Sequence, residues 1–236
     1  MPRRGKEAMT LSTAVFTLAF MPLTRLWMSR AIVGRCRSPA AAPAGRFTRT
    51  DAGVLWKEAW RAFAARSGNL PEEPTLGSRL VVRYACWSLA LLRALVSRGI
   101  DRARAVELVS DVTWLIYVKW GVLLRFRRGR GLTDGFGALP YGAIVPLRFP
   151  FNPPGFIAIW RPTDIGVRYD MVRCPLAEYF RQQSAVDLCV VSACGLDFAL
   201  VQQQGRTLKR DQTPVEGHEH CTFWWTPRRT NGPDLK

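Results

Sequence analysis

Side chains that could take part in catalysis or hold a metal are concentrated between residues 173 and 225. Four of the six cysteines and both histidines lie in this segment. Its motifs are Arg173-Cys174-Pro175, Cys194-x-x-Asp197, Arg210-x-x-Thr213 and Gly217-x-x-x-Cys221-x-Phe223. If this protein does chemistry, we expect the reacting groups to come from here.

Cys174 is predicted to stand at the start of a helix, because Pro175 favours the first helical position. The positive end of the helix dipole, together with Arg173 next to it, would lower the pKa of the thiol. That interpretation makes Cys174 a nucleophile or a metal ligand. The alternative is a buried cysteine that packs as a small hydrophobic side chain.

Cys194 and Asp197 are three residues apart on a helix predicted over residues 186–201, so both project from one face. Cys189 is expected to project from a different side. Asp197 lies in an otherwise apolar stretch, and a buried carboxylate needs a partner. Arg210, a metal or a substrate nitrogen could be that partner; the alternative is a solvated aspartate on an exposed stripe.

The last motif places polar and apolar side chains alternately. In an extended segment Glu216, His218 and His220 would share one face, and Cys221 and Phe223 the other. Thr213 and Gly217 are expected to shape a turn. Arg210 is expected to bind a carboxylate through its two-pronged guanidinium.

A zinc site is one further interpretation of the cysteines. Cys174, Cys194, Cys221 and one histidine would be a chemically sensible ligand set. Their long separations match no compact zinc motif. The cofactor therefore stays unidentified, with a divalent metal such as zinc as the candidate.

Composition limits the class of protein. With 236 residues, 48% of them hydrophobic, the chain can bury the core of one domain. The cysteines show no CxxC spacing, which favours reduced thiols and a cytoplasmic location. The net charge of +16 would suit nucleic acid, anionic membrane or acidic small molecules. No nucleic-acid-binding motif organises the arginines, so nucleic acid is not expected as a partner.

The first 49 residues are predicted to be a basic and apolar tract followed by an Ala/Pro-rich linker at residues 38–50. Residues 8–37 could contact a membrane peripherally as an amphipathic helix, which would make the cytoplasmic protein membrane-associated. A mis-assigned start, a membrane anchor and a signal peptide are the alternatives. Residues 50–236 are then a single domain, helical over 50–130 and carrying the motifs over 148–226.

The spacing of apolar residues predicts an α+β fold: an N-terminal helical hairpin region followed by a small mixed αβ domain with a short antiparallel sheet. Helices are expected over 51–68 with Asp51 as N-cap, over 78–98 with Gly99 as the stop, and from 101 to the basic run at 125–130. A rigid connector at 149–156 precedes strands at 157–160 and 165–172 and a helix from Pro175. Further strands are expected over 208–213 and 220–226.

Several motifs in residues 75–226 resemble the L-2-amino-thiazoline-4-carboxylic acid hydrolase family, and some look like features of its bacterial relatives. They are Thr75-Leu76-Gly77, Asp111-x-x-Trp114, Tyr117-x-x-Trp120, Phe149-Pro150-Phe151, Arg173-Cys174-Pro175, Glu178-Tyr179-Phe180, Cys194-Gly195-Leu196-Asp197, Leu208-Lys209-Arg210-Asp211-Gln212-Thr213 and Glu216 to Phe223. The C-terminal motifs are the specific part. Thr222 departs from the family pattern, which more often has aspartate there.

The resemblance implies a hydrolase that opens a cyclic amidine, 2-amino-thiazoline-4-carboxylate, to N-carbamoyl-L-cysteine in cysteine metabolism. On that hypothesis Cys174, Asp197 and His220 would be catalytic. Arg210, Thr213 and Arg173 would bind a small substrate with a carboxylate. The bond broken would be a non-peptide carbon–nitrogen or carbon–sulfur bond.

The same motif layout is distantly similar to small-molecule-binding 4-vinyl-reductase domains, which need not be enzymes. The second hypothesis is therefore a non-catalytic binding or sensing module. In it Cys174, Cys194 and Cys221 would line a pocket or hold a structural zinc.

Overall fold

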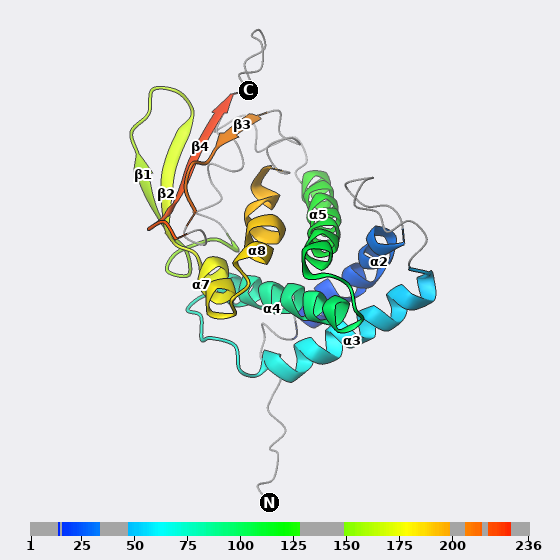
Figure 1. The fold of residues 1–236 in the computed structure, drawn as a ribbon. Coiled ribbons are helices and arrows are strands. Elements are labelled where there is room, and N and C mark those ends of the chain that lie inside the picture. Colours follow the sequence, from blue (N-terminus) through cyan, green and yellow to red (C-terminus); the bar gives the residue numbers. More distant parts are fainter. Residues whose placement is uncertain are drawn as a thin grey trace, which may run out of the picture.

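The computed structural model describes residue 14 and residues 16–33, 47–127, 149–198, 206–213 and 217–227. A helical part is followed by a four-stranded antiparallel sheet with helices packed against it, which confirms the α+β fold (Figure 1). The helical part consists of η1 (Phe16–Phe20, π-helical), α2 (Met21–Ile32), α3 (Arg49–Ser67), α4 (Leu76–Ser97) and α5 (Arg102–Arg127). Most of the predicted linker, the basic run beyond residue 127 and Glu216 lie outside the described residues.

The N-cap of α3 lies three residues before the predicted one. Thr48, not Asp51, is the N-cap: its hydroxyl accepts from the Asp51 backbone N–H at 3.2 Å. The Asp51 carboxylate in turn accepts from the Thr48 N–H at 2.7 Å, which completes a capping box. These hydrogen bonds hold the pKa of the Asp51 carboxyl below its usual value.

Helix α4 runs through the centre of the helical core. Thr75 and Ser78 form its capping box, and Gly99, with a φ of +77°, follows its end as predicted. Among the described helices, α4 has the length and apolar composition to cross a membrane, but 67% of its most apolar stretch is buried inside the protein. Burial of this extent is typical of a core helix, and α4 packs against α3, α5 and α7.

The N-terminal segment is part of this core. Phe16, Phe20, Met28 and Ile32 are buried, and the Phe20 ring meets Tyr84 of α4 edge-on at 5.7 Å. The helical core thus includes residues on both sides of the predicted boundary at residue 50. These four side chains are unavailable to a membrane in this arrangement, while Leu18 and Leu26 are exposed.

The sheet has the strand order β1-β2-β4-β3, all neighbours antiparallel. Its strands are β1 (Ile157–Arg161), β2 (Val167–Arg173), β3 (Arg206–Lys209) and β4 (Cys221–Pro227). The predicted third strand was misplaced, because residues 210–213 are not extended in the sheet. Gly166 turns into β2 with a φ of +80°, and a Cβ there would lie 2.0 Å from the Trp225 carbonyl oxygen.

The sheet has one buried face, as the alternation of residues predicted. Val167, Tyr169 and Met171 of β2 pair with Trp225, Phe223 and Cys221 of β4 on this face. The Tyr169 and Phe223 rings stack with centroids 4.9 Å apart. This face forms a second hydrophobic core beside the helical one.

The described part of the chain between β2 and β3 is mainly helical. Helix α7 (Pro175–Gln182) begins as predicted, with Cys174 as N-cap. The continuous helix expected over 186–201 is instead α8 (Val186–Cys189) followed by a π-helix, η4 (Val190–Cys194). Figure 1 shows α8 between the sheet and α5.

Candidate functional site

The predicted site residues meet where the two cores join. Cys174 packs against both the helical core and the sheet core. Cys174 is near enough to Cys194 and Asp197 for a negative charge on either to raise the pKa of its thiol. Cys221 is likewise near enough to Cys174, Cys194 and Arg210 for their charges to affect its pKa. The structure therefore brings Cys174, Cys194, Asp197, Arg210 and Cys221 together.

Asp197 and Arg210 form the central ion pair. Arg210 Nη1 donates to Asp197 Oδ2 at 2.7 Å, and Nη2 donates to the Cys194 carbonyl oxygen at 2.7 Å. The Arg210 side chain is only 6% exposed, whereas Asp197 keeps 30%. Of the three partners predicted for Asp197, the structure shows Arg210.

Aromatic rings surround this guanidinium. Its central carbon lies 4.9 Å from the Phe198 ring centroid and 5.5 Å from that of Phe223. These two rings keep water from much of the guanidinium. Nε and the remaining N–H groups of the fork still give Arg210 capacity to bind a carboxylate.

The π-helix η4 explains the placement of two cysteines. Residues five apart on an α-helix differ in direction by about 140°, which is why Cys189 was predicted on another side from Cys194. The Gly195 N–H instead donates to the Val190 carbonyl at 2.8 Å, five residues back. Cys189 and Cys194 are thereby brought into hydrogen-bonding contact, which corrects the prediction.

Burial dominates the electrostatics of the thiols. Cys174 makes no side-chain capping hydrogen bond. The backbone N–H groups of Leu176 and Ala177 favour the thiolate, but burial outweighs them and raises the pKa of the Cys174 thiol to about 12. The prediction of a lowered pKa for Cys174 is therefore wrong, and the thiol is protonated at neutral pH. Burial likewise raises the pKa of Cys221, and contact with Cys194 raises that of Cys189.

Two acidic groups near Arg210 share this environment. Burial raises the pKa of the Asp197 carboxyl, while the charge of Arg210 opposes the rise. Burial, with the nearby Asp197 charge, also raises the pKa of Tyr169, whose hydroxyl accepts from Trp225 Nε1 at 3.3 Å. Sequence reasoning missed Tyr169 as a site residue, since its position on the apolar face of β2 indicated only core packing.

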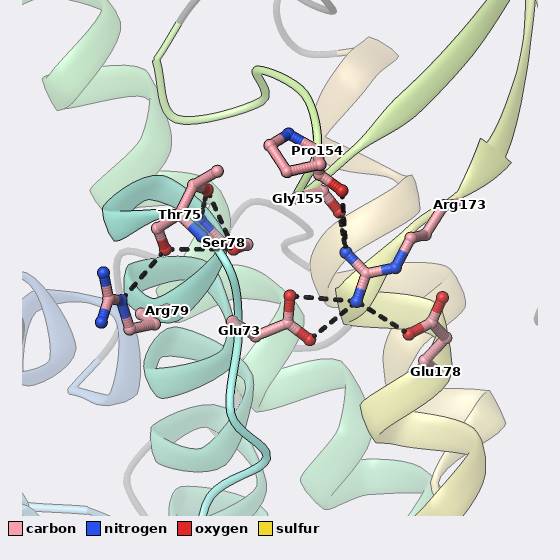
Figure 2. A network of polar contacts seen from close by, with 8 residues as sticks. All are labelled: Glu73, Thr75, Ser78, Arg79, Pro154, Gly155, Arg173 and Glu178. Atoms are coloured by element: carbon pink, nitrogen blue, oxygen red, sulfur yellow. Dashed lines mark hydrogen bonds and ion pairs between the residues drawn. The ribbon is translucent and has the colours of Figure 1, made fainter.

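Arg173 does not contribute to this cluster, contrary to the prediction. Figure 2 shows its guanidinium between Glu73 and Glu178, with the turn at Pro154 and Gly155 above it. Nη2 lies 3.1 Å from both carboxylate oxygens of Glu73 and 3.6 Å from Glu178. Nη1 donates to the carbonyls of Pro154 and Gly155. Arg173 therefore ties together three segments, and its predicted role in substrate binding has no support here.

His220 lies against Asp170, on the sheet face opposite Tyr169 and Met171, so the structure does not group it with Cys174 and Asp197, the other two residues predicted to be catalytic. Its Nε2 is 3.6 Å from Asp170 Oδ2, and Arg161 Nε is 2.5 Å from the same oxygen. The facing of His220 away from Cys221 agrees with the predicted alternation. Asp170 was not identified from the sequence, because it alternates with Tyr169 and Met171 and so falls on the face expected to meet solvent.

The turn predicted at Thr213 and Gly217 lies partly outside the described residues. The Thr213 carbonyl accepts from the His218 N–H at 3.4 Å, and Gly217 has a φ of +97°. The Thr213 side chain is 7% exposed and lies in the part of the chain just beyond Arg210. Thr222 has a structural role, because its hydroxyl accepts the N–H groups of Asp211 and Gln212 at 2.9 and 3.2 Å.

The predicted zinc set is not arranged as a metal site. Within the described ranges, no group of three or more His, Cys, Asp or Glu side chains is placed to hold a metal ion. Cys174, Cys194 and Cys221 are neighbours, but they do not form such a group.

Comparison with known proteins supports the resemblance. Residues 155–225 match the family model of L-2-amino-thiazoline-4-carboxylic acid hydrolase. The matched range runs from the end of the connector through β4, so it contains Cys174, Asp197 and Arg210 but none of α2 to α5. No curated protein and no solved structure matches the chain.

Proposed function

We propose that this protein is a hydrolase that opens a small cyclic amidine carrying a carboxylate, with L-2-amino-thiazoline-4-carboxylate as the first candidate and N-carbamoyl-L-cysteine as its product. The family match to residues 155–225 supports the reaction class. The observation that carries the proposal is the Asp197–Arg210 pair, enclosed by aromatic rings and partly open at Asp197.

The charges of this pair complement those of the substrate. A protonated 2-amino-thiazoline carboxylate bears one cation on its amidine and one anion on its carboxylate. Arg210 can bind the carboxylate through its fork, and Asp197 can bind the amidine. Binding would replace the ion pair between Asp197 and Arg210 by two ion pairs between the protein and the substrate, so neither the Asp197 nor the Arg210 charge is left unpaired.

The chemistry consumes one water. Water attacks the amidine carbon C2, the bond from C2 to the ring sulfur breaks, and the sulfur gains a proton to become the cysteine thiol. Asp197 accepts a proton from the attacking water and returns one to the leaving sulfur. Burial, which raises the pKa of its carboxyl, makes Asp197 a stronger base than a solvated aspartate.

Cys174 has a different role from the one first predicted. With its pKa at about 12, the thiol is a neutral neighbour of the reacting groups rather than a nucleophile. Attack by water is therefore preferred to attack by the thiolate.

Turnover of L-2-amino-thiazoline-4-carboxylate, followed by mass spectrometry of N-carbamoyl-cysteine, tests the proposal. Asp197→Asn and Arg210→Lys should each lower kcat/KM by at least about a hundredfold. The matched control is Asp187→Asn, which removes the carboxylate of an exposed pair with Arg102 and should leave turnover unchanged. Full activity in Asp197→Asn with the fold preserved would contradict the mechanism.

The second candidate is a non-catalytic binding module: burial holds the site thiols protonated, so they can line a pocket without reacting. Binding of the substrate without turnover, lost in Arg210→Lys, would support it. Cytoplasmic location, absence of nucleic-acid binding and membrane contact through residues 8–37 stay as proposals. Sedimentation with anionic vesicles, with and without residues 1–13, tests the last.

A further inference from the structure

Three carbonyl groups of η4 are bound by side chains from elsewhere in the fold. Ser110 Oγ of α5 donates to the Val191 carbonyl at 3.2 Å, and Tyr84 Oη of α4 donates to the Ser192 carbonyl at 3.1 Å. Arg210 donates to the third, that of Cys194, at 2.7 Å. A π-helical turn departs from the α-helical hydrogen-bonding pattern, and buried carbonyls left without donors are costly.

The π-turn sets the direction in which the side chains of the residues after it project. Returning it to α-helical hydrogen bonding would remove about one residue from the turn and rotate the following residues by about 100°. Asp197 follows three residues after the end of η4, so such a rotation would move its carboxylate away from Arg210. The ion pair of the candidate site thus depends on the π-turn.

Tyr84 is suited to hold this turn. Desolvation raises the pKa of its phenol, so the hydroxyl stays a hydrogen donor at any working pH. Phe20 packs edge-on against its ring at 5.7 Å, which fixes the ring from the side of η1. Ser110 is buried at 8% exposure on the neighbouring helix, where it reaches the preceding carbonyl.

We propose that Tyr84 and Ser110 are positioning residues: their hydroxyls hold the π-turn Val190–Cys194 and thereby aim Asp197 at Arg210. Neither residue lies in the segment that matches the hydrolase family. The consequence for catalysis rests on the proposed function, whereas the consequence for the turn does not.

The first test measures the turn itself. Amide exchange at Gly195, whose N–H makes the i→i+5 bond, and exchange of the Arg210 guanidinium N–H groups are followed by NMR. Tyr84→Phe and Ser110→Ala should each speed exchange at the Gly195 amide and at the Arg210 guanidinium by at least about tenfold, because a buried carbonyl loses its donor. Amides of α4 should be unchanged. Ser110→Thr, which restores a hydroxyl, should return the wild-type rates.

The control is Tyr179→Phe on α7. Tyr179 is also buried, with 4% of its surface exposed, and its hydroxyl interacts with Cys86. This substitution should leave Gly195 exchange at the wild-type rate. Unchanged exchange at Gly195 and Arg210 in both Tyr84→Phe and Ser110→Ala would overturn the proposal. Should Tyr84→Phe not fold, the comparison of Ser110→Ala with Ser110→Thr decides the same point.

The second test measures catalysis. Misplacing a base by about 1 Å can cost about a hundredfold, so Tyr84→Phe should lower kcat by about ten- to a hundredfold and change KM by less than about threefold. Faster Gly195 exchange with unaltered kcat would refute the positioning role. If the wild-type protein does not turn over the amidine, the proposed function fails, and the exchange rates still decide whether these hydroxyls hold the turn and the ion pair.

Discussion

Replacing Arg173 with methionine should destabilise the protein strongly, because it strands a buried charge. The Glu73 side chain is 5% exposed and meets Arg173 Nη2 with both oxygens at 3.1 Å (Figure 2). Removing one member of a buried pair costs about 3–5 kcal/mol, and the 26% exposure of Arg173 places this case at the lower end, about 3 kcal/mol. For a chain of this size that corresponds to a fall in Tm of about 6–12 °C.

Thermal and urea unfolding provide the assay, and Arg102→Met is the matched control. Arg102 also makes two hydrogen bonds to one carboxylate, that of Asp187, but these side chains are 51% and 46% exposed. Its loss should cost no more than about 1 kcal/mol. The double variant Glu73→Gln/Arg173→Met should recover at least about 1 kcal/mol relative to Arg173→Met, since the buried carboxylate is then no longer charged. Equal losses in Arg173→Met and Arg102→Met would refute the reasoning.

Two further predictions concern the thiol and the connector. At pH 8 the Cys174 thiol should be alkylated at least about a hundredfold more slowly than free cysteine, because burial raises its pKa to about 12. The alkylation rate should increase as the pH rises past about 10. Peptide mass spectrometry measures the rate, and alkylation at pH 8 as fast as that of free cysteine would contradict this prediction. Gly77→Ala should destabilise by about 1–3 kcal/mol, because its Cβ would lie 2.2 Å from the Pro150 carbonyl oxygen. Gly53→Ala on α3, where nothing lies within 4 Å, should stabilise by about 0.5–1 kcal/mol in the same urea titration; a similar loss in both would argue against the steric explanation.

Local patterns predicted most helices of the fold. The apolar spacing located α4 and α5, and Gly99 marked the end of α4 because its positive φ suits a residue without Cβ. The start of α3 was misplaced because Thr48 and Asp51 are both capping residue types. Which of them caps depends on the reciprocal hydrogen bonds between them, and spacing alone does not distinguish the two arrangements.

The partner of Asp197 could be predicted from the sequence, whereas the π-turn and the side chains that hold it could not. A carboxylate in an apolar stretch needs a partner, so Arg210 was among the expected partners of Asp197. The facing of Cys189 was wrong because an α-helical period was assumed. The donors that hold the π-turn are Tyr84 and Ser110, which are 108 and 81 residues from the carbonyls they bind. No local pattern carries that information.

The position of Cys174 was right and its predicted ionisation was wrong. A helix N-terminus favours a thiolate by modest electrostatics, whereas burial penalises the charge more strongly. Burial here comes from the meeting of two hydrophobic cores, one assembled from helices and one from the sheet. The sequence around residue 174 does not reveal that meeting.

That meeting of two cores has a consequence for how the molecule unfolds. Cys174 packs against both cores, Val81 of α4 and Tyr117 of α5 pack against the sheet core, and the Asp197–Arg210 pair lies at the same junction. Because helical and sheet side chains share this contact, the helices and the sheet should unfold together as one cooperative unit. A ligand bound to Asp197 and Arg210 would stabilise the whole of that unit, so its binding should raise the temperature of a single unfolding transition.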